Sequence, residues 1–175
     1  ANAVHNLAAD ASHDTLFHAH FLDSLQALKD PAAHREEARV IDVGSGGGFP
    51  GIPLLLARPG WRGVFIDSVK KKTEAVGDLS RKHLAGRGEA LWGRAENLAR
   101  ETAHRDRYDL AFCRAVGRFT TVLELTLPFL KAGGALLAHR GHEAPEETAA
   151  AAKALDALGG RLEAVTPYTL PGLDK

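Results

Sequence analysis

The sequence has no methionine, only one cysteine and no long apolar run, and each shortage excludes something. A lone thiol, Cys113, cannot form a disulfide within the chain, so nothing indicates an oxidising compartment. The longest apolar stretches, such as 52–57, are far too short to cross a bilayer. Because no charged and then apolar leader opens the chain, we expect a cytoplasmic protein. The absence of methionine even at position 1 indicates a trimmed chain.

The sequence also lacks a net charge, since 22 Lys and Arg residues balance 22 Asp and Glu residues. Proteins that coat nucleic acid non-specifically usually carry a basic excess, so this balance argues against a general nucleic-acid binder. It does not exclude an enzyme with one basic face. The share of hydrophobic residues, 45%, is ordinary for a globular chain, and the length fits one domain.

Apolar residues recur at helical spacing near the start of the chain, and predicted strands and helices alternate after it. Residues 14–28 are predicted to form a helix, because Phe17, Phe21 and Leu25 recur on one face. Strands are predicted at 40–43, 63–66, 90–92, 108–113 and 135–139. Further helices are predicted at 52–57, 70–84, about 96–100, 120–130 and 145–158. Such alternation with short breaks is typical of a Rossmann-like α/β fold, a mainly parallel sheet with helices on both faces.

Two further expectations concern the organisation of this fold. Residues 131–134, Lys-Ala-Gly-Gly, are predicted to turn ahead of the fifth strand, because glycine readily takes a positive φ. We expect one globular domain overall, with an N-terminal helical extension over 1–38 and the α/β domain over 39–175.

A glycine-rich loop, 44–51, follows the first strand and opens a helix. Its glycines, Gly44 and Gly46 among them, let the backbone approach a ligand closely, and the helix start offers free N–H groups. The spacing also satisfies the G-x-G-x-x-G fingerprint of dinucleotide sites, with Asp67 placed to bind a ribose after the second strand. The loop alone therefore leaves a nicotinamide-dependent oxidoreductase open.

Asp42 favours a different cofactor. It lies near the end of a strand that we expect to be buried, where a carboxylate is costly unless it is paired or hydrogen-bonded. A dinucleotide would place its pyrophosphate beside this anion, whereas S-adenosylmethionine carries an ammonium and a sulfonium group. We therefore favour S-adenosylmethionine, while a carboxylate that only accepts a loop N–H remains an alternative.

Several separated segments together resemble one family, the RsmG (GidB) 16S rRNA guanine-N7 methyltransferases. The segments are HFLDSL at 20–25, DVGSGGGFPGIP at 42–53, FIDS at 65–68 with three lysines at 70–72, GRAE at 93–96, CRAV at 113–116 and LLAHRG at 136–141. The Phe-Pro-Gly-Ile-Pro end of the loop is far more specific than a bare glycine motif. The resemblance implies a class I S-adenosylmethionine-dependent methyltransferase fold and a 39–175 methyltransferase domain. It also implies a last apolar strand with basic residues that would follow Lys175.

The resemblance assigns site residues as well. It implies a cofactor pocket with Asp67 at the ribose, and with these further lining residues: Gly44, Phe49, Ala95, Glu96 and Arg114. His20, Asp23 and Ser24 are expected to hold the N-terminal helix near the cleft, in a structural or substrate-positioning role. Arg140, with neighbouring basic residues near the strand ends, is expected to contact RNA.

The expected chemistry needs no catalytic side chain. Guanine N7 already carries a lone pair, so it can attack a sulfonium methyl group without first losing a proton, and positioning can supply much of the rate. We expect no metal, because the nine histidines show no ligand spacing. The expected partner is 16S rRNA or the small ribosomal subunit. A small-molecule methyltransferase and a non-catalytic RNA-binding module remain alternatives.

Overall fold

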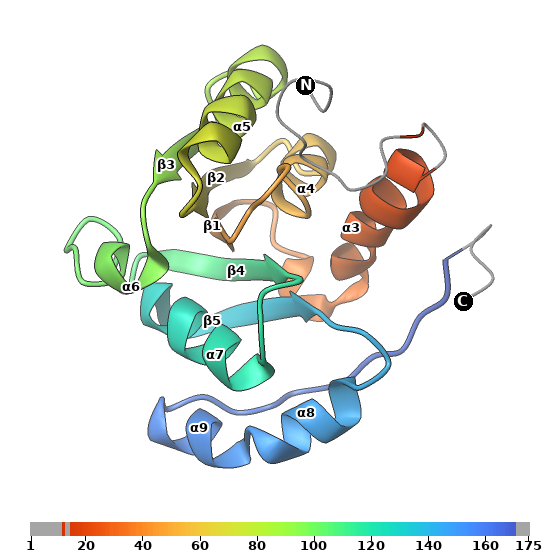
Figure 1. Cartoon of the computed structure of the whole chain (residues 1–175), viewed down its shortest axis with the longest axis vertical. Helices are drawn as coiled ribbons and strands as arrows, with labels where there is room; N and C mark the ends of the chain where they lie inside the picture. The colour runs from red at the N-terminus through yellow and green to blue at the C-terminus, as the bar shows by residue number, and fades with distance from the viewer. Residues whose placement is uncertain (1–11, 13–14, 171–175) are drawn as a thin grey trace.

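The structure, a computed structural model, describes residue 12 and residues 15–170 (Figure 1). The predicted helix start at residue 14 lies outside the described residues. None of the described helices is both long enough and apolar enough to cross a membrane.

Five parallel strands form one sheet in the order β3-β2-β1-β4-β5 (Figure 1). Their bounds are β1 Ala38–Val43, β2 Trp61–Asp67, β3 Gly88–Trp92, β4 Tyr108–Arg114 and β5 Leu130–His139. All five predicted strands are therefore present, and the predicted Rossmann-like fold is confirmed. The strand order reverses between β1 and β4, and in open α/β sheets such a reversal opens a crevice at the carboxyl ends of the strands.

Helices connect the strands as predicted. They are η1 Leu16–Leu22, α3 Asp23–Leu25, η2 Gln26–Lys29, η3 Pro31–Ala33, α4 Gly51–Ala57, α5 Lys70–His83, α6 Ala95–Leu98, α7 Phe119–Thr126, η4 Leu127–Phe129, α8 Ala144–Ala150 and α9 Ala152–Ala157. The predicted N-terminal helix is π-helical over η1 and becomes a 3-10 helix at η2. After it, the Asp30 side chain accepts a hydrogen bond from Ala32 N–H.

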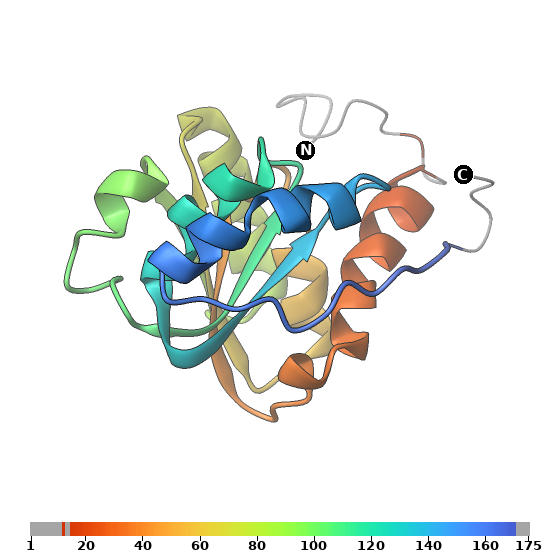
Figure 2. The same ribbon diagram turned by 90° about the horizontal axis from the view of Figure 1, so that it is seen from below.

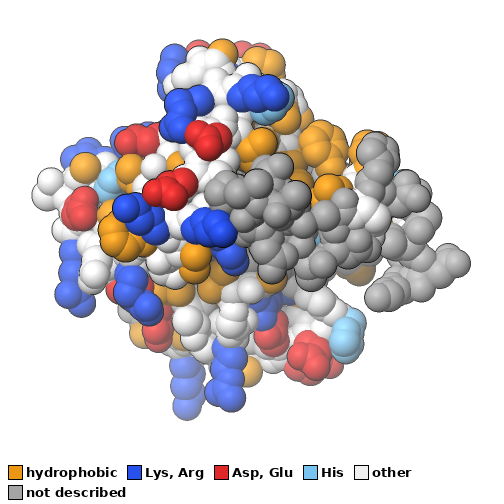
Figure 3. All heavy atoms as spheres, turned by 45° about the horizontal axis from the view of Figure 1, so that its top comes forward, with side chains coloured by type: hydrophobic (Ala, Val, Ile, Leu, Met, Phe, Trp, Pro, Cys, Tyr) orange, Lys and Arg blue, Asp and Glu red, His pale blue; other side chains and the backbone are white. Residues whose placement is uncertain are grey.

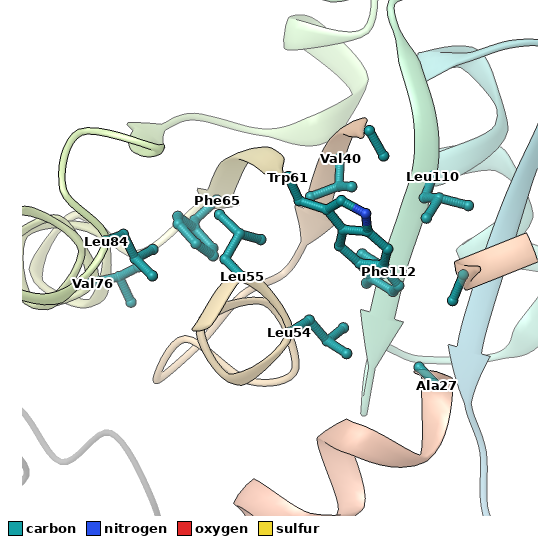
Figure 4. Packing of buried hydrophobic residues seen from close by; sticks show 12 residues of the cluster. Ala27, Val40, Leu54, Leu55, Trp61, Phe65, Val76, Leu84, Leu110 and Phe112 are labelled. Carbon is teal, nitrogen blue, oxygen red and sulfur yellow. The ribbon is translucent and has the colours of Figure 1, made fainter. Parts of the chain in front are cut away.

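One face of the sheet packs against the N-terminal helices, α4 and α5 (Figure 4). Trp61 from β2 and Phe112 from β4 stack there with ring centroids 6.0 Å apart, and both side chains are fully buried. Ala27 and Ala33 join the same cluster, so the segment before β1 contributes to the core. Truncating such a buried aromatic side chain typically costs about 3–5 kcal/mol of stability.

The opposite face is covered by the C-terminal half of the chain. Ile41 and Ile66 pack there against Phe129 and the residues of α6. Phe119 and Val122 of α7 form a third cluster with Leu155 of α9. The three central strands, β1, β2 and β4, therefore bury both faces, as their near-continuous apolar runs predict.

The predicted turn at 131–134 is wrong, because β5 already begins at Leu130. Its pairing with β4 shifts register between Tyr108 and Leu110, and Gly133 has a φ of +76°. Leu130 pairs with Tyr108 and Ala135 pairs with Leu110, so residues 131–134 lie opposite Asp109 alone and form an irregularity inside the strand, which glycine commonly marks. The glycines here bend the strand and do not precede it.

After α9 the chain returns without regular secondary structure. Figures 1 and 2 show this segment, drawn in blue, running back past β5 toward the N-terminal helices. The Tyr168 hydroxyl ends this run by donating a 2.6 Å hydrogen bond to Asp23 Oδ1. The two ends of the described chain therefore meet beside the carboxyl edge of the sheet.

Candidate functional site

A cavity of about 490 Å³ opens at the carboxyl ends of the strands, where the strand order reverses. Its volume lies in the range of sites for small molecules and cofactors. Eight of the predicted site residues line it, namely His20, Gly44, Gly46, Phe49, Asp67, Ala95, Glu96 and Arg114. The structure thus brings together residues that lie far apart in the sequence.

Gly44 begins the loop that forms the floor of this cavity. Its N–H donates to Ile66 O at 2.9 Å, and its φ is +74°, a conformation that favours glycine. A Cβ atom added here would lie 2.6 Å from Val116 Cγ2, on the opposite wall. Any side chain at this position would therefore strain the loop and push into the cavity.

Asp42 lies beneath the loop and does not line the cavity. Its carboxylate is 1% exposed, and Oδ2 accepts a 2.9 Å hydrogen bond from Gly51 N–H. Burial raises its pKa to about 7, although the Gly51 hydrogen bond and Arg114 both oppose the rise. The geometry therefore shows Asp42 holding the loop, which was the alternative role, and its contact with the cofactor remains a prediction.

Asp67 lines the cavity at the end of β2. Its Oδ2 accepts from Gly46 N–H at 2.9 Å, and its Oδ1 accepts from Val69 N–H at 2.8 Å. A carboxylate has about four acceptor positions, so each oxygen retains one for a hydroxyl donor. Asp67 thus fixes the glycine loop and can still accept from two ribose hydroxyls.

Ala95 and Glu96 line the wall beyond β3, at the start of α6. The backbone N–H of Glu96 and the neighbouring Arg94 guanidinium lower the pKa of the Glu96 carboxyl. This side chain is therefore ionised at neutral pH and can accept a hydrogen bond from a ligand. Phe49 also lines the cavity, with its ring centroid 5.3 Å from that of His20.

Arg114 ends β4 and connects the sheet to the N-terminal helices. Its Nη1 donates to Asp23 Oδ2 at 3.0 Å and to Ala19 O at 3.3 Å, while Nη2 lies 3.0 Å from His20 Nδ1. The guanidinium also lies 5.4 Å from the Phe49 ring centroid. With four neighbours around it, Arg114 is held in one orientation at the mouth of the cavity.

A second cavity, of about 420 Å³, adjoins the first and shares Arg114 and Ala115 with it. The predicted residues Asp23 and Arg140 line it, together with His139 and Tyr168. Arg140 donates to both carboxylate oxygens of Glu147 and to Gly117 O, and these hydrogen bonds with Glu147 raise its pKa. Arg140 therefore holds the wall of the second cavity in place.

Ser24 differs from its predicted neighbours because it reaches neither cavity. Its side chain is fully buried, and the hydroxyl donates to His20 O one helical turn earlier. Burial and this internal hydrogen bond give Ser24 a role inside the helix, away from any ligand. His20, in contrast, lines the first cavity beside Arg114.

Sequence reasoning missed Tyr168. The residue lies in the irregular segment after α9, where neither periodicity nor a motif marks it. Burial, followed by its contact with Asp23, raises the pKa of the Tyr168 hydroxyl, which therefore stays protonated as a donor. Among the described residues, no group of three or more His, Cys, Asp or Glu side chains is arranged to hold a metal ion.

Solved structures share this fold. A predicted O-methyltransferase from Agrobacterium tumefaciens matches with a TM-score of 0.58 and 17% identity, over 74% of this chain and 67% of that one. An S-adenosylmethionine-dependent methyltransferase from Thiobacillus denitrificans, in complex with S-adenosyl-L-homocysteine, matches with a TM-score of 0.50 and 24% identity, over 67% and 46%. The fold is that of the class I S-adenosylmethionine-dependent methyltransferases, as predicted.

The family follows from the sequence comparison. The family model described as rRNA small subunit methyltransferase G, GidB, matches residues 1–170. Proteins named ribosomal RNA small subunit methyltransferase G match at 40% identity in Gloeobacter violaceus, over 95% of this chain and 66% of the relative, and in Deinococcus deserti, over 98% and 70%. The chain belongs to the rRNA small subunit methyltransferase G family, which confirms the predicted resemblance. It spans about two thirds of the length of these relatives.

Proposed function

We propose that the protein transfers a methyl group from S-adenosylmethionine to N7 of a guanine in 16S rRNA. The observation that carries this proposal is the junction of two cavities at Arg114, at the carboxyl edge of a methyltransferase sheet. One cavity suits the cofactor and the other suits the acceptor base. Membership of the rRNA small subunit methyltransferase G family supports RNA as the acceptor and the cytoplasm as the place of action.

The first cavity fits the cofactor in size and in polarity. Asp67 is placed to accept from two ribose hydroxyls, while Ala95 and Glu96 offer a contact surface to the adenine. Gly44 packs directly against Val116, and without a side chain its backbone can approach the methionine portion, while Arg114 offers a cation for its carboxylate. When bound, S-adenosylmethionine supplies an electrophilic methyl group on a positively charged sulfur. The residues of the chain bind it, orient it and exclude water.

The groups that line the second cavity favour an acceptor that needs no deprotonation. The Asp23 carboxylate already accepts from Arg114 and Tyr168, and the raised pKa of Tyr168 keeps that hydroxyl protonated. Burial lowers the pKa of His139, but its Nδ1 is enclosed in the protein and its Nε2 contacts Asp23 O. Among the described residues at this cavity, none is therefore placed as a general base. An N7 lone pair attacks directly, so this arrangement suits guanine N7 better than a hydroxyl acceptor.

The proposal is tested by transfer of labelled methyl groups from S-adenosylmethionine to small ribosomal subunits that lack the modification, followed by nucleoside digestion. We expect label in N7-methylguanine. Naked 16S rRNA, assayed in parallel, distinguishes the two forms of the substrate. Label in another nucleoside would contradict the N7 assignment, and transfer to small molecules alone would contradict an RNA substrate.

A further inference from the structure

Trp92 is the most exposed of the large hydrophobic side chains in the described part of the chain, at 60%. It ends β3, and its indole Nε1 donates to Ser68 O at 3.0 Å, which fixes the orientation of the ring. Val69, which is 47% exposed, lies next to Ser68 in the chain. An exposed tryptophan held by a hydrogen bond is a rigid aromatic surface already shaped for contact.

A lysine lies over this ring. Lys70 Nζ lies 5.6 Å from the Trp92 ring centroid, and Lys71 follows it on the exposed surface at the start of α5. Lys70 has one ion pair, with Glu74 at 4.0 Å, in which both side chains are more than 60% exposed. Exposed pairs of this kind contribute about 1 kcal/mol or less, so Lys70 can exchange Glu74 for a stronger anion.

The ring also lies at the proposed reaction edge. Trp92 pairs with Asp67 in the sheet register, and its neighbours Ser68, Val69 and Gly93 line the cofactor cavity. Three strand spacings, or about 14 Å, separate the end of β3 from Arg114 at the end of β4. A chain molecule bound at the second cavity can therefore reach Trp92 along the same edge.

On the face shown in Figure 3, Lys and Arg side chains are interspersed with Asp and Glu side chains and with hydrophobic groups. This pattern matches the zero net charge. Because the described part of this face has no extended basic surface, we expect a small group of residues to bind a polyanion such as RNA. A planar ring beside Lys70, with the exposed Lys71 next in the chain, provides such a local contact. Single-stranded nucleic acid binds to this combination, because bases stack on aromatic rings while phosphates contact the cations.

We propose that Trp92, Lys70 and Lys71 form a binding site for an unpaired RNA nucleotide, whose base stacks on the indole and whose phosphates contact the lysines. The site rests on the proposed function, because it would hold the strand that carries the target guanine. It lies outside the cofactor cavity, since Trp92 does not line that cavity. Its effect is therefore on RNA affinity and not on cofactor affinity.

The sequence offers a direct optical test. The chain contains only two tryptophans, and Trp61 is fully buried, so Trp92 accounts for the exposed component of the emission. Titration with a single-stranded oligoribonucleotide of about ten nucleotides should quench that component to saturation. In parallel, anisotropy of a labelled oligoribonucleotide should show that Trp92→Ala weakens RNA binding about tenfold. The affinity for S-adenosylmethionine should stay unchanged, which shows that the variant is folded.

One further variant separates stacking from charge. Lys71→Ala should lower the slope of log Kd against log salt by about 0.7, as expected for one phosphate contact in a single strand, whereas Trp92→Ala should leave that slope unchanged. Leu158→Ala, which truncates another exposed hydrophobic side chain, is the matched control and should bind RNA like the wild type.

Emission that does not change with RNA, or a Trp92→Ala variant that binds RNA with wild-type affinity, would overturn the site. Failure of the proposed function gives a different result. RNA would then still quench the Trp92 emission, and Trp92→Ala would still weaken RNA binding, in a protein that transfers no methyl group. That result would support the RNA site and contradict the proposed methyl transfer.

Discussion

The hydroxyl of Tyr168 lies 2.6 Å from Asp23 Oδ1, and this hydrogen bond joins residues 145 positions apart in the chain. The other oxygen of the same carboxylate accepts from Arg114, whose guanidinium borders both cavities. Asp23 is therefore the link through which the irregular segment after α9 reaches the site. We therefore expect the orientation of Arg114 to depend on the hydrogen bond by which Tyr168 fixes the Asp23 carboxylate.

We expect Tyr168→Phe to reduce kcat about five- to tenfold, because one hydrogen bond contributes about 0.5–1.5 kcal/mol net and its loss frees Asp23 and Arg114 to move. The affinity for S-adenosylmethionine should change less than twofold. Steady-state kinetics with isothermal titration of the cofactor separates these effects. Val165→Ala, an exposed change in the same segment, is the control. If both variants lowered kcat equally, Tyr168 would only anchor the segment.

Gly44→Ala should abolish measurable binding of S-adenosylmethionine. The added Cβ would meet Val116 Cγ2 at 2.6 Å, and the positive φ would cost roughly 1 kcal/mol besides. Gly86→Ala is a matched control, since Gly86 has a φ of +77° but nothing lies within 4 Å of the added Cβ. Calorimetric titration of both variants isolates the steric effect. Equal loss of binding in the two variants would show that general destabilisation is responsible.

The ion pair between Asp23 and Arg114 should contribute far more than a surface pair. Both side chains are less than a fifth exposed, so removing one partner leaves the other partly buried and unpaired. A double-mutant cycle of Asp23→Asn and Arg114→Gln should give a coupling energy of about 2 kcal/mol in urea denaturation. The exposed pair of Asp78 and Arg81 should give less than about 0.5 kcal/mol. Similar values for the two pairs would contradict the anchoring role of Asp23.

Asp42 should make stability fall as the pH rises from about 4 to about 7. Its pKa in the folded protein is about 7, above the ordinary value of 3.8, so the unfolded chain loses this proton first and gains stability over that range. Asp42→Asn removes the ionisation while keeping an oxygen for Gly51 N–H. Between pH 5 and pH 8 the wild type should lose roughly 2 kcal/mol of unfolding free energy relative to this variant. Parallel pH profiles for the two proteins would contradict the raised pKa.

Much of the fold and of the first cavity could be predicted, because the signals are local. Each strand contains a short apolar run, and the glycine loop with Asp67 lies within a single β–α–β unit. The start of β5 could not be predicted, because Gly133 and Gly134 resemble a turn, whereas Leu130 before them already pairs with Tyr108 of β4 and regular pairing resumes at Ala135. Glycine is favoured both in turns and at irregularities within strands, so its presence does not distinguish the two.

Only some of the residues that line the second cavity could be predicted from the sequence. The resembling segments indicate Asp23 and Arg140, although the ion pair of Asp23 with Arg114 joins distant parts of the chain and depends on tertiary packing. The resemblance of the HFLDSL segment assigns Ser24 together with Asp23, yet neighbouring helical residues point in different directions, and Ser24 is fully buried. Tyr168 carried no signal, since its contact with Asp23 is set by the path of an irregular segment across the whole fold.

The central claim is that the two cavities are the two halves of one transfer site, with Arg114 between them. A crystal structure of the protein with S-adenosyl-L-homocysteine tests it most directly. The account predicts adenosine beside Asp67 and Ala95, and a sulfur atom that lies near Arg114 and faces the second cavity. A ligand in the reverse orientation, or a sulfur atom screened from the second cavity by protein, would contradict it.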